Sequence, residues 1–385
     1  MEGEILLKIS FLIYSLGPGG AEKIVSYLLN HFSNKYEIFL VLMNSTIFYK
    51  IPENIKIFYL EDSNPYEHGL KKFFKLPFLA YKYSKFCMQH NIDISLSFMT
   101  RPNYINALSK KFKNRAKIII NERAMPSLQH KKGIQGKINR ILIKKIYKYA
   151  DKILSNSKGN KFDLEKNFNL KVDDFIYNFI DLNYIYHKSK EILENFKKDR
   201  FIFITIGRID EGKNHKLIID ALKNLNFDFY FYIIGDGPLK NFLQNYVKRI
   251  KIEDKIFFLG RQYNPYKFLS KADCFVFSSN YEGFPNAILE ALACGLPVIS
   301  TDCRSGPREI LAPDTDFRYE ADKIELAEYG ILVPVGDAFK FAEAMKLIYE
   351  NKKLRDNYKK KAIKRAEDFD IGKIIKKWEE ILNLD

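Results

Sequence analysis

Two glutamates, Glu282 and Glu290, stand eight positions apart in a stretch whose residue types could bind a hydroxyl-rich ligand. An apolar, strand-like run at 274–279 precedes them, and we expect Pro285 to begin a helix that ends near Gly295. Eight helical positions separate two carboxylates by roughly 12 Å along the axis, whereas the acid pair of a glycoside hydrolase lies roughly 5–9.5 Å apart. The spacing therefore fits two grips on separate parts of one elongated ligand. It fits equally well an ordinary loop acid followed by a solvated helix acid.

A diphosphate site is the second chemistry that the sequence allows. Arg208 and Lys213 follow an apolar run at 201–206, and they combine a planar guanidinium fork with a point charge. Gly235-Asp-Gly237 follows the next strand-like run. Because the carboxyl ends of parallel strands meet at one edge of a sheet, we expect these turns and the loop at Glu282 to border one crevice. The helix after that loop would add free backbone N–H groups at its N-terminus.

A glycine cluster in the first half has the form of a phosphate-binding loop. Gly19 and Gly20 lie between a predicted strand at 5–14 and a run with helical spacing of apolar residues. The cluster matches neither the GxGxxG nor the Walker A pattern. Tight packing of a helix on a sheet also requires glycine, so this signal is weak by itself.

No motif for a metal or an organic cofactor is present. The six histidines are scattered, and the four cysteines show no CxxC spacing, which favours reduced, buried thiols. Asp314-Thr-Asp316 has the spacing of a metal-binding acid pair, but it lies in a polar insertion at 312–328, away from any predicted strand end. We interpret it as a turn and predict no metal site and no cofactor. The role of the insertion is not assigned.

The order of apolar runs predicts an α/β protein with two Rossmann-like domains facing a central cleft. Strand-like runs alternate with helix-like runs in both halves, which is typical of parallel sheets covered on both faces. We expect an N-terminal domain at 1–178 and a C-terminal domain at 179–369. The amphipathic segment at about 370–385 is expected to pack back on the first domain.

The positive charge is concentrated in the first half of the chain. The net charge is +16, with 29 basic and 15 acidic residues in 1–178 but 34 and 32 in 179–385. Two segments, 70–86 and 131–149, mix lysines with apolar residues, as helices do that lie on an anionic membrane surface. An ordinary amphipathic helix with its apolar side in the core is an equal alternative. The lysines of the first segment are Lys71, Lys72, Lys75, Lys82 and Lys85.

The sequence offers no basic signal-peptide start and no apolar run of about 20 residues, so we expect a soluble or peripheral protein. A nucleic-acid-binding protein would account for the charge, but it gives no reason for acids at strand ends, and we predict no nucleic-acid partner.

Taken together, these motifs make the chain resemble the retaining GT-B glycosyltransferases of glycosyltransferase family 4 over nearly its full length. The matching motifs are Gly19-Gly20-Ala21-Glu22, Gly207-Arg208 with Lys213-Asn214, Gly235-Asp236-Gly237, Glu282-x7-Glu290 and Ser305-Gly306-Pro307-Arg308-Glu309. The resemblance implies that Glu282 lies by the donor sugar, that Glu290 binds the ribose, and that Arg208 and Lys213 stabilise the departing UDP. It implies further donor contacts from the backbone at Gly19, Gly20, Gly207, Gly283, Phe284, Pro285 and Asn286.

The first domain has a closer likeness to the N-acetylgalactosaminyltransferases of bacterial N-linked protein glycosylation. It is carried by the segments 11–22, 74–83, 101–104, 120–122 and 156–160. Many members of the wider family have a histidine after the fifth strand of this domain, where Asn121-Glu122-Arg123 stands here. Glu122 is therefore the candidate for contact with the reacting sugar.

The resemblance implies a metal-independent hexosyltransferase with no cofactor, which uses UDP-GalNAc and acts on a saccharide linked to undecaprenyl diphosphate. The expected linkage is α-1,4, and the expected place is the cytoplasmic face of the inner membrane, where the five lysines would meet acceptor or lipid phosphates. A lipooligosaccharide or capsule transferase with another UDP-hexose is the first alternative. A non-catalytic sugar-binding relative is the second.

Overall fold

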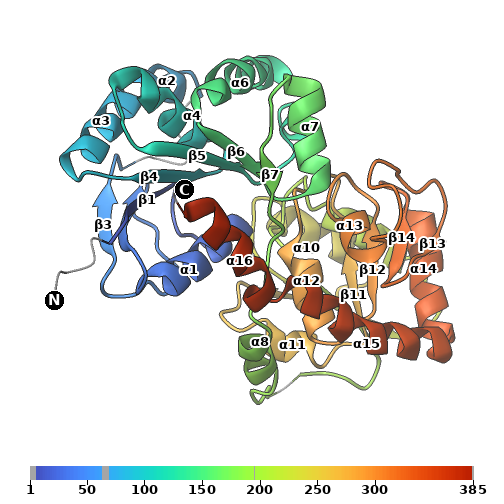
Figure 1. Ribbon diagram of the computed structural model, residues 1–385. Helices are drawn as coiled ribbons and strands as arrows, with labels where there is room; N and C mark the ends of the chain where they lie inside the picture. The colour runs from blue at the N-terminus through green and yellow to red at the C-terminus, as the bar shows by residue number, and fades with distance from the viewer. Residues whose placement is uncertain (1–5, 63–68, 195, 384–385) are drawn as a thin grey trace. The chain divides into compact units, whose positions relative to one another are not determined.

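The computed structural model describes residues 6–62, 69–194 and 196–383 (Figure 1). The chain divides into two units, residues 1–176 with 375–385, and residues 177–374. Residue 5 of the first predicted strand and residues 384–385 of the last predicted helix lie outside the described residues. Each unit is described separately below.

A parallel sheet forms the centre of the first unit. Its strands run in the order β3-β2-β1-β4-β5-β6-β7, and each neighbouring pair is parallel. The order reverses between β1 and β4, which is the position where open α/β sheets bind ligands, beyond the carboxyl ends of the strands. The strands are β1 (Lys8–Ile13), β2 (Glu37–Leu42), β3 (Lys56–Tyr59), β4 (Ile94–Phe98), β5 (Lys117–Glu122), β6 (Lys152–Ser155) and β7 (Asp174–Phe175).

Helices cover both faces of this sheet, as Figure 1 shows for α3, α4 and α6 on one side and α1 and α16 on the other. Leu79 of α3 and Ile143 of α6 belong to one core cluster with Val41 of β2. The side chain of Trp378 on α16 is fully buried, with its ring centroid 5.8 Å from that of Phe98. The helices are α1 (Gly20–Phe32), α2 (Gly69–Phe74), α3 (Leu76–Gln89), α4 (Thr100–Ser109), α5 (Pro126–Gln129), α6 (Gly133–Ile146), α7 (Lys158–Phe168) and α16 (Ile371–Leu382).

The second unit has a sheet in the order β10-β9-β8-β11-β12-β14-β13, and only the β13–β14 pairing among its described strands is antiparallel. The order reverses between β8 and β11. The strands are β8 (Phe201–Ile206), β9 (Phe229–Ile234), β10 (Ile256–Gly260), β11 (Cys274–Phe277), β12 (Val298–Thr301), β13 (Glu325–Leu326) and β14 (Ile331–Val333). The helices are α8 (Leu182–Ser189), α9 (His215–Leu222), α10 (Lys240–Arg249), α11 (Tyr266–Leu269), α12 (Asn286–Ala293), α13 (Pro307–Leu311), α14 (Ala338–Glu350) and α15 (Lys352–Ala366).

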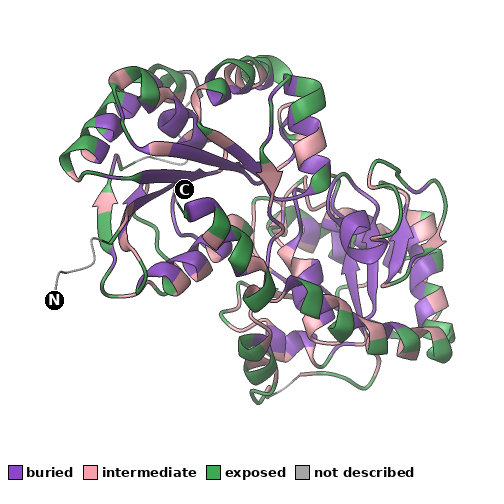
Figure 2. Cartoon of the chain, in the orientation of Figure 1, coloured by how far each residue is buried: buried purple, intermediate pink, exposed green. Residues whose placement is uncertain are grey.

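Alternate residues of the central strands enter two different cores in this unit. Ile202 and Ile204 of β8 pack in one cluster with α12, whereas Phe203 packs in the other with α9. Figure 2 shows the central strands of both sheets as buried, whereas the edge strands, such as β3 and β13, are only partly buried or exposed. A strand that is buried on both faces reads as an unbroken apolar run, which is why the pattern predicted parallel sheets.

The α/β prediction is confirmed, and the predicted strands lie within a few residues of the observed ones. Among the described residues, no helix combines the length and the apolar character that a membrane crossing needs. The helix predicted to begin at Pro285 begins instead at Asn286, with Pro285 as its N-cap residue in an extended conformation. Gly295 follows the C-cap with a φ of +73°, as a helix-ending glycine does.

Candidate functional site

The candidate site of the second unit lies where the strand order reverses. The turns after β8, β9, β11 and β12 all leave the sheet at its carboxyl edge, and these strands are neighbours in it. Gly207 and Lys213 follow β8, Gly235 follows β9, and Glu282 follows β11. The structure therefore brings together the three motifs that the sequence placed at strand ends.

An ion pair between Lys213 and Glu282 joins two of these turns. The Lys213 Nζ lies 2.5 Å from Glu282 Oε1, and the two side chains are 27% and 12% exposed. The ammonium also lies 5.2 Å from the ring centroid of Phe277. A partly desolvated ammonium beside a carboxylate is suited to a ligand that has both an anionic part and hydroxyl groups.

Local hydrogen bonds explain why Lys213 points to Glu282. Its backbone N–H donates to the Asp210 carboxylate at 3.0 Å, which closes the turn after β8. The hydroxyl of Ser278 at the end of β11 donates to the Lys213 carbonyl at 2.8 Å. The two turns are thus tied to each other.

Glycine at position 235 allows the neighbouring turns to pack backbone against backbone. Gly235 has a φ of +145°, and a Cβ atom built on it would lie 1.9 Å from the carbonyl oxygen of Gly207. No side chain fits in that space. Gly235 thereby sets the position of the backbone at Gly207, one of the predicted donor contacts.

The loop at 283–286 and helix α12 lie directly after Glu282. The Ser305 hydroxyl donates to the Gly283 carbonyl at 2.9 Å, and Phe284 and Pro285 are buried. Glu290 is only 6% exposed. The interpretation of Glu290 as a solvated helix acid is therefore wrong, because α12 turns this carboxylate into the protein rather than into water.

Two residues next to the predicted domain boundary, Tyr177 and Asn178, hold this loop. The Asn178 side-chain amide donates to the Phe284 carbonyl and to Asn286 Oδ1, both at 2.6 Å. The ring of Tyr177 stacks on Phe284 with centroids 4.5 Å apart, and its hydroxyl donates to Glu309 at 3.0 Å. No spacing rule predicts such contacts, because more than 100 positions separate the partners in the chain.

Arg208 is the predicted residue that the structure leaves outside the cluster. Its side chain is 71% exposed and lies 3.5 Å from the Asp210 carboxylate. His215, in contrast, is buried beside the cluster and was not predicted. Burial, helped by the charge of Lys213, lowers the pKa of His215 to about 3, so this imidazole is neutral at physiological pH.

In the first unit, Gly19 and Gly20 lie at the N-terminus of α1, with Gly19 as the N-cap residue. A Cβ atom built on Gly19 would fall 2.1 Å from a carboxylate oxygen of Glu22, so this acid folds back over the start of the helix. Burial raises the pKa of Glu22. The part of the two glycines in donor binding stays a prediction.

Glu122 ends β5 as a buried carboxyl group, 1% exposed. It accepts hydrogen bonds from the hydroxyls of Tyr147 at 2.5 Å and Thr100 at 3.3 Å, and from the backbone N–H of Arg123 at 3.0 Å. Burial raises the pKa of Glu122 and lowers that of Arg123 to about 9. The contact of Glu122 with a sugar stays a prediction, and these partners engage its carboxyl group within the unit.

The five predicted acceptor or membrane lysines lie on and between α2 and α3. Lys71, Lys82 and Lys85 are exposed, whereas Lys72 and Lys75 are half-buried. The same helices expose Phe74 by 75% and Phe78 by 66%, while Leu79 and Tyr83 enter the core. The segment at 70–86 thus places one side in the core and exposes a basic, aromatic surface on the other. A helix that lies on a membrane and an amphipathic helix that packs on the core are therefore not exclusive alternatives for this segment.

The Asp314-Thr-Asp316 segment forms a turn, as predicted. The backbone and side chain of Arg318 donate to the Asp316 carboxylate, which lowers the pKa of Asp316 to about 2. Within the described part of the chain, no group of three or more histidine, cysteine or acidic side chains is arranged to hold a metal ion.

The architecture of two parallel-sheet β/α units is that of the GT-B enzymes, and comparison with known sequences shows that the chain belongs to the group 1 glycosyltransferases. A family model described as "Glycosyl transferases group 1" matches residues 188–365. A relative from Campylobacter jejuni is 42% identical over 95% of this chain and 97% of its own. That relative is named N-acetylgalactosamine-N,N'-diacetylbacillosaminyl-diphospho-undecaprenol 4-alpha-N-acetylgalactosaminyltransferase.

Two further comparisons agree with this assignment. A second C. jejuni protein, 26% identical over 98% of both chains, is named GalNAc-alpha-(1->4)-GalNAc-alpha-(1->3)-diNAcBac-PP-undecaprenol alpha-1,4-N-acetyl-D-galactosaminyltransferase. The crystal structure of Anabaena HepE in complex with UDP-glucose covers 98% of this chain and 99% of its own, with a TM-score of 0.78 at 19% identity. The resemblance drawn from the motifs and the predicted GT-B architecture are both confirmed.

Proposed function

We propose that the protein transfers N-acetylgalactosamine from UDP-N-acetylgalactosamine onto a saccharide carried by undecaprenyl diphosphate, with retention of the anomeric configuration and an α-1,4 linkage. The substrates follow from the C. jejuni relative at 42% identity, which aligns over nearly the whole of both chains. That relative acts on the shorter of the two named acceptors, so a saccharide ending in one GalNAc on diacetylbacillosamine is the first acceptor to test.

The observation that carries the site assignment is the Lys213–Glu282 ion pair at the switch point. In the proposed complex, Lys213 and Arg208 face the diphosphate and Glu282 accepts hydrogen bonds from hydroxyls of the sugar. The backbone of Gly283 to Asn286 and the N-terminus of α12 face the phosphates. Glu290, buried on α12, binds the ribose.

The proposed reaction occurs on one face of the sugar and needs no metal. The acceptor hydroxyl oxygen bonds to the anomeric carbon from the side on which the bond to UDP breaks. The hydroxyl proton passes to the departing phosphate oxygen, and the electron pair of the broken bond leaves with UDP. Lys213 stabilises the negative charge that develops on the leaving group, which is the main contribution of the protein.

The test is a transfer assay with a panel of UDP-sugars and a short-chain polyprenyl-diphosphate saccharide. We expect product with UDP-GalNAc in the presence of a chelator. Lys213→Ala and Glu282→Ala should each lower kcat by about 10²–10³-fold, as the loss of one electrostatic stabiliser does. Lys216→Ala is the matched control, because Lys216 pairs with Asp220 on the outer side of α9 and is 44% exposed.

Three results would contradict the proposal. Near-full activity of both alanine variants would refute the site. Preference for another UDP-hexose, with a lipooligosaccharide or capsule acceptor, would favour the alternative transferase. No transfer and no UDP binding with any donor would indicate a non-catalytic relative.

We also propose that the protein binds the cytoplasmic face of the inner membrane through α2 and α3. The exposed Phe74 and Phe78 beside Lys71 and Lys85 support this, because aromatic rings and lysines together favour an anionic interface. Vesicles with and without anionic lipid test it. The triple change of Lys71, Lys72 and Lys75 to glutamate should abolish binding, whereas the same change at Lys353, Lys360 and Lys364 on α15 should not.

A further inference from the structure

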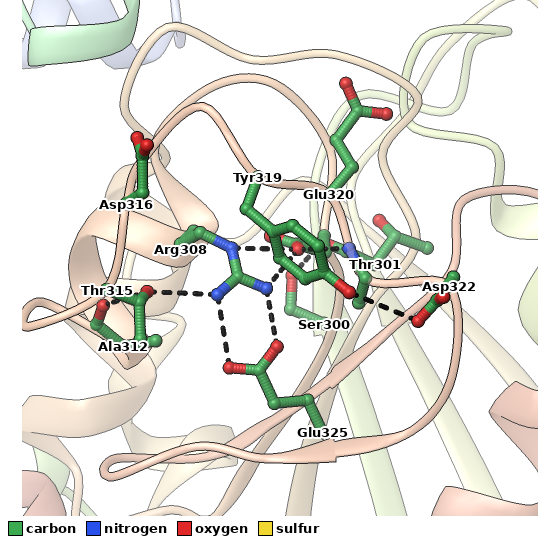
Figure 3. Close-up of polar contacts among 12 residues, drawn as sticks. Ser300, Thr301, Arg308, Ala312, Thr315, Asp316, Tyr319, Glu320, Asp322 and Glu325 are labelled. Atoms are coloured by element: carbon green, nitrogen blue, oxygen red, sulfur yellow. Dashed lines mark hydrogen bonds and ion pairs between the residues drawn. The ribbon is translucent and has the colours of Figure 1, made fainter.

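The insertion at residues 312–328, between α13 and β14, has no part in the function proposed above. It starts with a turn and ends in β13, which pairs antiparallel with β14 at the edge of the sheet. Three of its residues, Thr315, Tyr319 and Glu325, contact one arginine, Arg308 of α13, as Figure 3 shows. The position of the insertion therefore depends on the contacts of that side chain.

Arg308 is almost completely enclosed, with a side chain 4% exposed. Its Nε and Nη2 donate to Asp302 Oδ2 at 3.0 and 2.5 Å, and its Nη1 and Nη2 donate to the Glu325 carboxylate at 3.1 and 2.6 Å. Nη1 also donates to the Thr315 hydroxyl at 3.0 Å, and the ring of Tyr319 lies 4.8 Å from the guanidinium carbon. These bonds use all five N–H groups of the guanidinium, a pattern that lysine cannot reproduce.

The cluster joins the insertion to the residues that follow β12, which we call the support loop, residues 302–306. Asp302 accepts from the insertion as well as from Arg308, because the backbone N–H of Ala321 donates to its Oδ2 at 2.7 Å. Arg304 donates to the Arg318 carbonyl at 3.1 Å and pairs with Glu320. The insertion thus holds the support loop at two of its five residues.

The support loop in turn holds the backbone at Glu282. The Glu282 N–H donates to the Arg304 carbonyl at 2.9 Å, and the Ser305 N–H donates back to the Glu282 carbonyl at 3.1 Å. The Ser305 hydroxyl donates to the Gly283 carbonyl at 2.9 Å. The insertion is therefore connected to the acid that pairs with Lys213 in three steps: hydrogen bonds from Glu325 through Arg308 to Asp302, the backbone of the support loop, and the bonds of that loop to Glu282.

We propose that Arg308 is a positioning residue, and that the insertion acts through it and the support loop to set the Glu282 carboxylate against the donor sugar. This inference rests on the proposed function. Buried ion pairs add little net stability compared with apolar packing, but they fix one geometry, because any other arrangement leaves a buried charge without its partner. A displacement of a catalytic group by about 1 Å can cost about 10²-fold in rate, so such a constraint is useful at this loop.

The test uses Glu325→Gln, since Glu325 is 28% exposed and the change leaves both partners of the Arg308–Asp302 pair in place. Gln keeps the shape of the side chain but presents an N–H₂ group to one guanidinium nitrogen. We expect kcat/KM for the UDP-sugar to fall by about fivefold to twentyfold, with UDP affinity changed less than twofold, at a temperature where circular dichroism shows every variant folded. Arg308→Lys should show the same split with a larger loss.

Arg318→Gln is the control within the insertion, because Arg318 makes an exposed ion pair with Asp316 and its side chain does not reach the support loop. A double-mutant cycle of Glu325→Gln with Ser305→Ala separates positioning from stability. Both changes act on one loop, so the double variant should lose less than the product of the two single effects.

Three outcomes overturn the inference. These are multiplicative effects in the cycle, a Glu325→Gln variant that melts earlier but keeps its kcat/KM when folded, and an equal loss in Arg318→Gln. If the wild-type protein itself neither binds UDP nor transfers sugar, the proposed function fails and this inference fails with it. An active wild type with a fully active Glu325→Gln refutes the inference alone.

Discussion

The side-chain amide of Asn178 provides the sharpest test of how the donor loop is held. Asn178 is 4% exposed and donates to the Phe284 carbonyl and to Asn286 Oδ1 at 2.6 Å each. Asn178→Ala removes both bonds, at a net cost of about 1 kcal/mol for each, so about 2 kcal/mol. Asn178→Asp keeps the size of the side chain but replaces the N–H₂ donor by an oxygen. An acceptor then faces an acceptor oxygen at both contacts.

The aspartate variant should be the more damaging of the two. A carboxylate facing two acceptors in a buried place costs about 3 kcal/mol or more, and at about 2–4 °C per kcal/mol the melting temperature should fall by about 6–12 °C. The surroundings raise the pKa of the new carboxyl above its unfolded value, so the native state binds the proton more tightly. The penalty is therefore complete above the folded pKa and shrinks as the pH falls through it, because a protonated acid can donate one of the lost bonds.

Thermal melting at pH 5 and pH 8, together with KM for the UDP-sugar, checks this account. Asn224→Asp is the matched control, since Asn224 is exposed at the end of α9 and its amide makes one bond of 3.2 Å to the Asp220 carbonyl. We expect a smaller effect at pH 5 and a KM raised about tenfold for Asn178→Asp, which corresponds to about 1.4 kcal/mol. If the Asn178 and Asn224 variants matched in melting and in KM at both pH values, the loop would not depend on this amide.

Three further predictions concern stability. Gly235→Ala should lower the unfolding free energy by about 3 kcal/mol or more, because the added Cβ would overlap a backbone carbonyl. The control Gly336→Ala should cost only about 1–2 kcal/mol, because its φ is +81° but no atom lies within 4 Å of the added Cβ. Equal losses of unfolding free energy in urea would contradict this. Burial lowers the pKa of His215 to about 3, so the unfolded chain takes up the proton first as the pH falls. The stability that comes from the neutral, buried His215 is therefore complete above about pH 6.5 and is lost between about pH 6.5 and 3. The unfolding free energy falls there by at most about 1.4 kcal/mol per pH unit. His215→Gln should flatten that slope and the exposed control His187→Gln should not. Trp378 is the single tryptophan of the chain and is fully buried in the first unit, so Trp378→Ala should lower the unfolding free energy of that unit by about 3–5 kcal/mol. The tryptophan fluorescence of the wild type should report the unfolding of the same unit. An emission maximum of the native protein that is already typical of a tryptophan in water would refute this.

The fold could be predicted from the sequence because its strands are buried on both faces. Phe229–Ile234 is an unbroken apolar run and Phe201–Ile206 is interrupted only by Thr205, and their two sets of alternate side chains enter different cores. Short edge strands carry no such signal. β13 at Glu325–Leu326 is two residues long and only partly buried, and it exists because the insertion pairs with β14.

The part of the candidate site that could be predicted is the part where the backbone conformation requires a particular residue type, such as glycine. Glycines at strand ends, such as Gly235, mark close approaches of the chain, and they led to turns that the structure places at one edge of the sheet. Contacts between side chains distant in sequence leave no such mark. The bonds from Asn178 to Phe284 and from Arg308 to Glu325 depend on which turns become neighbours, and only the folded arrangement of the sheet determines that.

Glu282 and Glu290 differ in their surroundings because of such contacts. Glu282 lies at a strand end, its backbone is bonded to the support loop and its carboxylate to Lys213, so it is held at the carboxyl edge of the sheet with 12% of its side chain exposed. Glu290 lies on α12 and is directed into the protein, so that only 6% of the residue is exposed. An incoming diphosphate would give Lys213 a new anionic partner and would leave the Glu282 carboxylate in need of donors. The hydroxyl groups of a sugar can supply those donors, whereas the diphosphate offers only acceptor oxygens, and this difference supports the proposed assignment of the sugar to Glu282.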